Sequence, residues 1–242
     1  MFFLIIVKSR REILWTLIFA VSGIAFGAAV HFTPIFRTFG QNGTKTIKVI
    51  VDAGHGLPDG GTVGAGGTIE QEINLAVANK LCEVLEGKGI SVVMTRTSEN
   101  CLCDEQEGKT LRQIKKEDMN SRLGIIKKSN ADLFISIHMN YFNSQSANGL
   151  RLFYAANHSE IKRLAENIQS RMSDVTGAKM YAVKTADKNL FLMKNPPIPA
   201  ILIECGFLSN IEEEKKLNDD DYQSRIAWAI ADAIEKYYKE ML

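Results

Sequence analysis

Apolar and polar positions along this chain form blocks that alternate between strand-like and helix-like spacing. Short apolar runs predict strands at residues 47–51, 90–94, 133–138, 150–154, 190–193 and 200–204. Apolar residues that repeat every three or four positions predict helices at residues 70–86, 117–129, 160–176 and 219–240. Because strands and helices alternate, the sequence predicts a three-layer α/β domain, with helices on both faces of a mostly parallel or mixed sheet.

Two stretches interrupt this alternation. Residues 98–116 are charged and irregular, which favours a solvated insertion over the alternative of a rim above a substrate groove. Residues 56–67 contain six glycines and form a predicted loop after the first strand. Such loops can bind phosphate, but this turn carries neither Gly-x-Gly-x-x-Gly nor Gly-Lys-Ser/Thr, so phosphate binding is not predicted.

The N-terminal region has the pattern of a membrane segment. Residues 13–32 carry no Asp, Glu, Lys or Arg and follow the basic residues Lys8, Arg10 and Arg11. A helix of this length spans about 30 Å, the thickness of a bilayer core, and a basic flank stays in the cytoplasm. We therefore expect residues 1–32 to be an uncleaved anchor, with a cleaved signal peptide as the alternative. A polar linker at residues 33–46 then leads to the main domain at residues 47–242.

Composition narrows the possible functions. The chain has 242 residues, of which 45% are hydrophobic and 24% charged, as in ordinary globular proteins. Its net charge of +1 gives no indication of nucleic-acid binding. Cys82 and Cys205 lie in apolar patterns and are expected in the core. Cys101 and Cys103 form a Cys-x-Cys in a polar stretch, for which an exposed loop is favoured over a second metal site.

Three potential metal ligands lie at the ends of predicted strands and helices. His55 comes after the first strand, His138 ends the strand at residues 133–138, and Glu70 begins the first helix. The carboxyl ends of parallel strands meet at one edge of a sheet, so these histidines are expected to converge there. The glycine-rich loop would then bring Glu70 back to them. Two imidazoles and one carboxylate, with one coordination position open, are the ligands of a catalytic zinc ion.

Glu204 is a fourth candidate, because it ends an apolar strand where glutamate is unexpected. A buried glutamate needs a partner, and either a proton-carrying role beside a metal-bound water or an ion pair with an arginine would supply one. Ordinary structural roles remain open for the other residues. A histidine at a strand end is often a hydrogen-bonded core residue, and Glu70 also suits the first turn of a helix.

Several segments together resemble, in order, the motifs of the zinc-dependent N-acetylmuramoyl-L-alanine amidases (amidase type 3). They are Val51-Asp52-Ala53-Gly54-His55-Gly56, Glu70-Gln71-Glu72-Ile73-Asn74-Leu75, Arg122 with Ser136-Ile137-His138-Met139-Asn140, and Pro199-Ala200-Ile201-Leu202-Ile203-Glu204-Cys205-Gly206-Phe207-Leu208-Ser209-Asn210. The resemblance covers roughly residues 48–238 and departs at Ala53, where many members have proline. That difference changes the stiffness of the loop and not its chemistry.

The resemblance implies that His55, Glu70 and His138 bind one zinc ion and that Glu204 is the catalytic glutamate. The implied reaction is hydrolysis of the amide between N-acetylmuramic acid and L-alanine in peptidoglycan, with Glu204 acting as general base and then general acid. Arg122 would orient Glu204 or bind a substrate carboxylate, and a surface ion pair is an equal alternative. Asn140 would brace the site from behind the ligands.

Within this family the chain looks most like the germination-specific, spore-cortex branch. That branch also has a bare catalytic domain behind an N-terminal hydrophobic segment, and a comparable insertion after a strand ending in Met94-Thr95-Arg96. The likeness implies removal of stem peptides from cortex glycan on the pathway to muramic lactam. It also implies an extracytoplasmic location at the forespore envelope, membrane attachment through the N-terminal segment, and a targeting or activating protein partner.

Three other functions fit parts of the same pattern. A zinc peptidase or carboxypeptidase would use similar ligands on another fold. A non-catalytic wall-binding protein would need neither Glu204 nor an open metal position. A structural zinc site is disfavoured, because such sites are usually four-coordinate and rich in cysteine.

Overall fold

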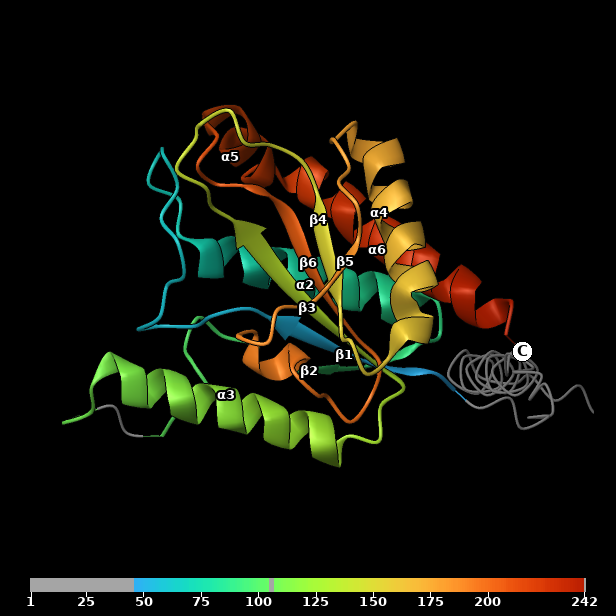
Figure 1. Ribbon diagram of the computed structural model, residues 1–242, viewed down its shortest axis with the longest axis horizontal. Helices are drawn as coiled ribbons and strands as arrows, with labels where there is room; N and C mark the ends of the chain where they lie inside the picture. The colour runs from blue at the N-terminus through green and yellow to red at the C-terminus, as the bar shows by residue number, and fades with distance from the viewer. Residues whose placement is uncertain (1–45, 105–106, 242) are drawn as a thin grey trace, which may run out of the picture. The chain divides into compact units, whose positions relative to one another are not determined.

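A six-stranded sheet forms the centre of the computed structural model, which describes residues 46–104 and 107–241 (Figure 1). In chain order its strands are β1 (Lys48–Ala53), β2 (Ser91–Met94), β3 (Leu133–Asn140), β4 (Arg151–Tyr154), β5 (Lys184–Thr185) and β6 (Ala200–Phe207). Their spatial order is β2-β1-β3-β6-β4-β5. Strands β2, β1, β3 and β6 run parallel, whereas β4 is antiparallel to β6. The mixed sheet expected from the sequence is confirmed.

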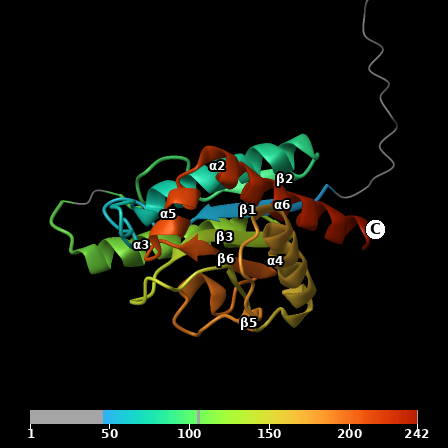
Figure 2. The same ribbon diagram turned by 90° about the horizontal axis from the view of Figure 1, so that it is seen from above.

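Helices cover both faces of this sheet, so the predicted three-layer architecture is also confirmed (Figure 2). On one face pack α2 (Glu70–Gly87), α4 (Lys162–Thr176) and α6 (Asp220–Lys239). On the other face pack α3 (Leu111–Lys128) and the short 3-10 helix η2 (Phe191–Met193). The remaining helices are η1 (Ser159–Ile161) and α5 (Ile211–Leu217).

Successive residues of each strand serve opposite layers, because side chains alternate across a sheet. In β3, Ile135 joins the core under α2, α4 and α6, while Phe134 joins the core under α3 and η2. In β6, Ile203 and Leu202 divide in the same way. Both sets are buried, which explains why these strands read as continuous apolar runs and not as alternating patterns.

Two predicted elements differ from the structure. The predicted strand at residues 190–193 is instead the 3-10 helix η2, because so short an apolar run does not distinguish a strand from a helical turn. The helix predicted from residue 117 begins at Leu111, so the last part of the irregular stretch at 98–116 is helical. Its start is a capping box, in which Thr110 and Gln113 satisfy each other's backbone N–H groups.

The boundaries of other elements also differ from the predicted ones. Strand β6 continues past Glu204 to Phe207, and the two-residue strand β5 and the short helix α5 were not predicted. The final helix was predicted well: Asp219 caps it by accepting a hydrogen bond from the Tyr222 N–H.

The predicted membrane segment, and all of the predicted linker except residue 46, lie outside the described residues. Within the described ranges, every helix is too short or too polar to cross a bilayer.

The cysteines fall into two groups. Cys82 and Cys205 are buried and free, as expected. Cys101 and Cys103 form a disulfide with each other. Cys101 lies in a loop as predicted, but the expectation that it is exposed is wrong, since it is buried. Its N–H donates to the Leu57 carbonyl and ties this segment to the loop after β1.

Candidate active site and metal centre

The structure brings His55, Glu70 and His138 together at the carboxyl-terminal edge of the parallel strands. Glu70 Oε1 lies 3.3 Å from His55 Nε2 and 3.1 Å from His138 Nδ1. One possible ligand atom from each residue lies within 4.8 Å of the other two. The three side chains come from the loop after β1, the first residue of α2 and strand β3, so the parallel strand order itself creates the cluster.

His55 is held in an unusual backbone conformation. Its φ of 62° lies in the left-handed region, which costs a residue with a Cβ of order 1 kcal/mol or more. Two contacts hold it there: Arg122 donates a hydrogen bond to the His55 carbonyl, and Asp59 Oδ2 lies 3.0 Å from His55 Nδ1. The contact with Asp59 orients the ring so that Nε2 faces Glu70 and the cluster.

Glu70 is held by the glycine-rich loop that precedes it. Its N–H donates to the Thr62 carbonyl, and its Oε2 accepts from the Thr62 N–H at 2.9 Å and from the Thr62 hydroxyl at 3.2 Å. Gly61 must lack a side chain, because its φ is +74° and a Cβ there would overlap the Glu70 carboxylate. The loop therefore turns back on α2, which is how a residue 15 positions beyond His55 reaches the same site.

Glu204 lies beside this cluster. It occupies the fifth position of β6 and pairs in register with His138 on β3, so both side chains project from the same face of the sheet. Its Oε2 is buried and accepts no hydrogen bond from the residues that the structure describes. Burial and the neighbouring Glu70 charge raise the pKa of Glu204 to about 7, although His138 and His55 oppose the shift. Such a carboxyl group can take up and release a proton near neutral pH.

The pKa values of His55 and Glu70 shift in opposite directions. Burial disfavours protonation of His55, but its contacts with Asp59 and Glu70 outweigh burial and raise its pKa to about 9. Burial would raise the pKa of Glu70, but the two histidines outweigh it and hold that pKa far below its usual range. The carboxylate charge of Glu70 is therefore stabilised, and a cation is favoured between these three side chains.

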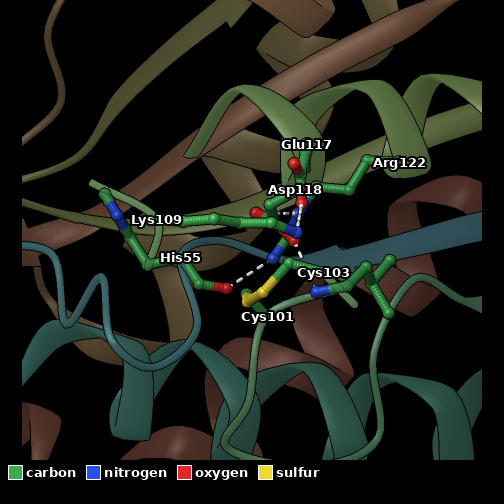
Figure 3. Close-up of a disulfide and its surroundings, with 8 residues drawn as sticks. His55, Cys101, Cys103, Lys109, Glu117, Asp118 and Arg122 are labelled. Carbon is green, nitrogen blue, oxygen red and sulfur yellow. Dashed lines mark hydrogen bonds and ion pairs between the residues drawn. A yellow bond between two sulfur atoms is a disulfide. The ribbon is translucent and has the colours of Figure 1, made fainter. Parts of the chain in front are cut away.

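Arg122 is buried behind the candidate metal ligands. Its side chain is 0% exposed, so it forms no surface ion pair and cannot meet a substrate carboxylate. Its guanidinium forms ion pairs with Asp52 and Asp118 and donates to the carbonyls of Ala53 and His55. Figure 3 shows this side chain reaching from α3 to the backbone of His55. Arg122 thus fixes the backbone of His55, one of the candidate ligands.

Asn140 stands on β3 two residues after His138 and lines the same cavity. Its backbone carbonyl accepts from the Leu208 N–H at 2.9 Å, which joins the end of β3 to the chain beyond β6. A bracing role for its side chain stays a prediction.

The cluster opens into a cavity of about 490 Å³. His55, Glu70, His138 and Glu204 line it together, and α3 and η2 supply the opposite wall. The exposed ring of Phe191 belongs to that wall, where the sequence predicted a strand. The cavity is thus a cleft between the strand ends and the α3 layer, with the reactive side chains along one side.

Sequence reasoning missed two residues of the site. Asp59, which contacts the second nitrogen of His55, stands four positions after it in the same loop, and this spacing was the available signal. Lys115 approaches Asp59 from α3 and lines the cavity. It was missed because the start of α3 was read as irregular.

The donor set suits a divalent metal ion. Two imidazoles and a carboxylate are zinc ligands. The buried Glu204 oxygen, which has no partner among the described residues, fits a group that exchanges a proton with water at that ion. An α/β sheet that places such a cluster beside a buried carboxyl group, at the edge of a cleft, is typical of hydrolases.

Comparison with known proteins places the chain within one such class. The sequence profile of the N-acetylmuramoyl-L-alanine amidase family matches residues 49–236, and the chain belongs to this family. The germination-specific N-acetylmuramoyl-L-alanine amidase of Bacillus subtilis is 36% identical over 192 residues, covering 79% of this chain and 80% of that protein. The amidase LytC of the same organism is 30% identical over 193 residues, covering 79% of this chain and 35% of LytC.

Solved structures agree with this assignment. The CwlD amidase from Clostridioides difficile, solved in complex with the GerS lipoprotein, has 40% identity and a TM-score of 0.77. The match covers 81% of this chain and 100% of that one. The catalytic domain of the amidase CwlV from Bacillus (Paenibacillus) polymyxa var. colistinus has 30% identity and a TM-score of 0.69, covering 80% and 99% of the two chains. The expected likeness to a germination-specific amidase is confirmed.

Proposed function

We propose that this protein is a zinc-dependent amidase that cleaves the bond between N-acetylmuramic acid and L-alanine in spore-cortex peptidoglycan. The observation that carries the proposal is the cluster of His55, Glu70 and His138 in a chain of the amidase family, beside a Glu204 oxygen that has no partner in the described part of the chain. In this proposal His55, Glu70 and His138 hold the zinc ion, and Arg122 and Asn140 support them.

Each residue has a chemical task in the proposed reaction. When bound, zinc supplies Lewis acidity, which makes water more acidic and the amide carbonyl more electrophilic. Glu204 accepts a proton from the attacking water and returns a proton to the nitrogen of L-alanine as the C–N bond breaks. The products are the lactyl carboxylate of the glycan and a stem peptide with a free amino terminus. A pKa of Glu204 near 7 allows both proton transfers at neutral pH.

The cortex assignment is supported by the relatives. A germination-specific amidase and an amidase solved in complex with a lipoprotein both resemble this chain over about four fifths of its length. We therefore propose that the protein acts outside the cytoplasm at the forespore envelope, where removal of stem peptides precedes formation of muramic lactam. The basic and apolar N-terminal segment would attach it to the membrane, and a protein partner would target or activate it. A pull-down from sporulating cells that recovers no partner would count against the last point.

The decisive test is mass spectrometry of purified peptidoglycan after treatment with the full-length protein. We expect free L-alanine amino termini and glycan without stem peptides. When a chelator is added to the enzyme, the peptidoglycan should stay uncleaved. Cleavage inside the stem peptide would instead identify a peptidase, and zinc binding without cleavage would identify a wall-binding protein.

A matched variant locates the proton carrier. Glu204→Gln keeps the shape of the side chain but cannot accept the proton, so kcat is expected to fall about 10²- to 10⁴-fold. Its zinc content, measured by atomic absorption, should equal that of the wild type, because Glu204 is not one of the three ligands. A fully active Glu204→Gln variant would exclude the proposed role.

A further inference from the structure

One cation stands apart from the candidate metal ligands in the cleft. Lys115, on the second turn of α3, lines the cavity that holds His55, Glu70, His138 and Glu204. Its ammonium lies 3.0 Å from Asp59 Oδ1, and 47% of its side chain is exposed. The ammonium therefore faces both the candidate metal site and the solvent from which a substrate must enter.

The ion pair with Asp59 leaves Lys115 able to bind a further anionic group. The pair is exposed on the Lys115 side only, because the Asp59 side chain is 18% exposed. Asp59 also has other partners, since its Oδ2 contacts His55 Nδ1 and its Oδ1 accepts from the Gly61 N–H at 3.3 Å. An ammonium has three N–H donors, so the half-exposed Lys115 can bind a second carboxylate on its solvent side.

Besides Lys115 and the two histidines, the described cavity wall has one basic residue, Arg122, and it cannot bind a ligand. Arg122 is 0% exposed, and its guanidinium is occupied by Asp52, Asp118 and two backbone carbonyls. The wall also carries several carboxyl groups, which repel an anion. They belong to Asp52, Asp59, Glu70 and Glu204. An anionic group of a ligand in this cleft thus has Lys115 as its partner among the described lysines and arginines of the wall.

We infer that Lys115 binds the free α-carboxylate of the second residue of the stem peptide, next to the L-alanine whose amide bond is cleaved. This inference rests on the proposed function. Two contacts of 3.0 Å and one carboxylate group separate the Lys115 ammonium from the His55 ring. A peptide of two or three residues covers such a span when it is extended at ~3.5 Å per residue. Lys115 is therefore a specificity residue, and the charge of the second residue decides how well a stem is cleaved.

Paired substrates test this inference. They are soluble glycan strands whose stem peptides carry, as second residue, either D-glutamate with a free α-carboxylate or the corresponding α-amide. The full-length protein is compared with Lys115→Met and Lys115→Arg. The control is Lys116→Met, which removes the adjacent exposed lysine on the same helix, outside the cavity wall.

We expect the wild type to prefer the free acid. Lys115→Met should lose about 10- to 100-fold in kcat/KM on the acid, mainly through KM, because a charge-assisted hydrogen bond is lost. Its rate on the amide should stay within about twofold of the wild type. Lys115→Arg should restore most of the preference, and Lys116→Met should match the wild type on both substrates.

Other outcomes overturn the inference in distinguishable ways. Equal losses on both substrates, together with reduced zinc content, would mean that Lys115 acts through Asp59 and His55 and does not bind the stem. Equal cleavage of both substrates by wild type and Lys115→Met would exclude the carboxylate contact while leaving the amidase proposal intact. Release of no stem peptide from either substrate by the wild type would refute the proposed function, and the inference with it.

Discussion

Replacing Arg122 with methionine removes the cation that bridges two buried carboxylates. The side chains of Arg122, Asp52 and Asp118 are 0%, 1% and 6% exposed, so water cannot compensate for the loss. Breaking a buried ion pair from one side costs about 3–5 kcal/mol, against a total stability of about 5–15 kcal/mol for typical proteins. With a urea m-value of about 2 kcal/mol/M, the midpoint of unfolding should fall by about 2 M.

The pH dependence gives this prediction a second readout. Burial alone would raise the pKa of Asp52, but Arg122, Ser136 and Thr95 outweigh burial and lower it. A lowered carboxyl pKa stabilises the fold above the unfolded value of about 3.9, and that contribution disappears as the pH falls through the folded value. The difference between Arg122→Met and the wild type should therefore shrink in acid.

The control for this experiment is Arg112→Met, an exposed position on the same helix. Its free energy of unfolding should stay within about 0.5 kcal/mol of the wild type. Urea unfolding of both variants, followed by circular dichroism, measures the comparison. A midpoint for Arg122→Met within about 0.3 M of the wild type would refute the reasoning, since two unpaired buried carboxylates would then cost almost nothing.

Three further predictions concern metal binding. Gly54→Ala should weaken zinc binding without unfolding the chain, because the added Cβ would overlap the His138 imidazole. In the control Gly87→Ala the new Cβ has no neighbouring atom within 4 Å, so zinc affinity in a competition titration should be unchanged. Asp59→Asn should lower zinc affinity about 10- to 100-fold in the same titration, because the carboxylate that orients His55 is lost. His55 must lose a proton to bind zinc, and contacts with Asp59 and Glu70 raise its pKa to about 9. Zinc affinity should therefore rise about tenfold per pH unit between pH 6 and 8, with about one proton released in calorimetry. A zinc affinity that does not change with pH would show that His55 is already neutral.

The elements that the sequence predicted well are those with long or strongly periodic apolar patterns. Helices α2, α4 and α6 and strands β1, β3 and β6 appear close to their expected positions, because their apolar residues face a core on one side or both. The errors fall where the signal is short or polar. Four apolar residues could not distinguish η2 from a strand, and the first turn of α3 was concealed by charged residues around the Thr110 cap.

The site divides in a similar way. Parallel neighbouring strands place the residues at their carboxyl ends side by side, so the meeting of His55 and His138 followed from the strand pattern. Glu204 joins them for the same reason, because it lies at the same edge on the neighbouring strand β6. Lys115 and the burial of Arg122 did not follow, because both depend on how α3 lies across the sheet. Helix placement is set by the packing of whole surfaces, and spacing along one helix cannot show it.

By itself, the order of residues determined the layers of this protein, the strands whose ends face the cleft, and the chemical types available there, since periodicity and residue identity are local properties. Tertiary structure decided which charges are buried in pairs, which cation is half exposed in the cleft, and which carboxylate oxygen has no described partner. Those outcomes depend on distances between segments that lie far apart in the chain, and electrostatic energies change steeply with distance and burial.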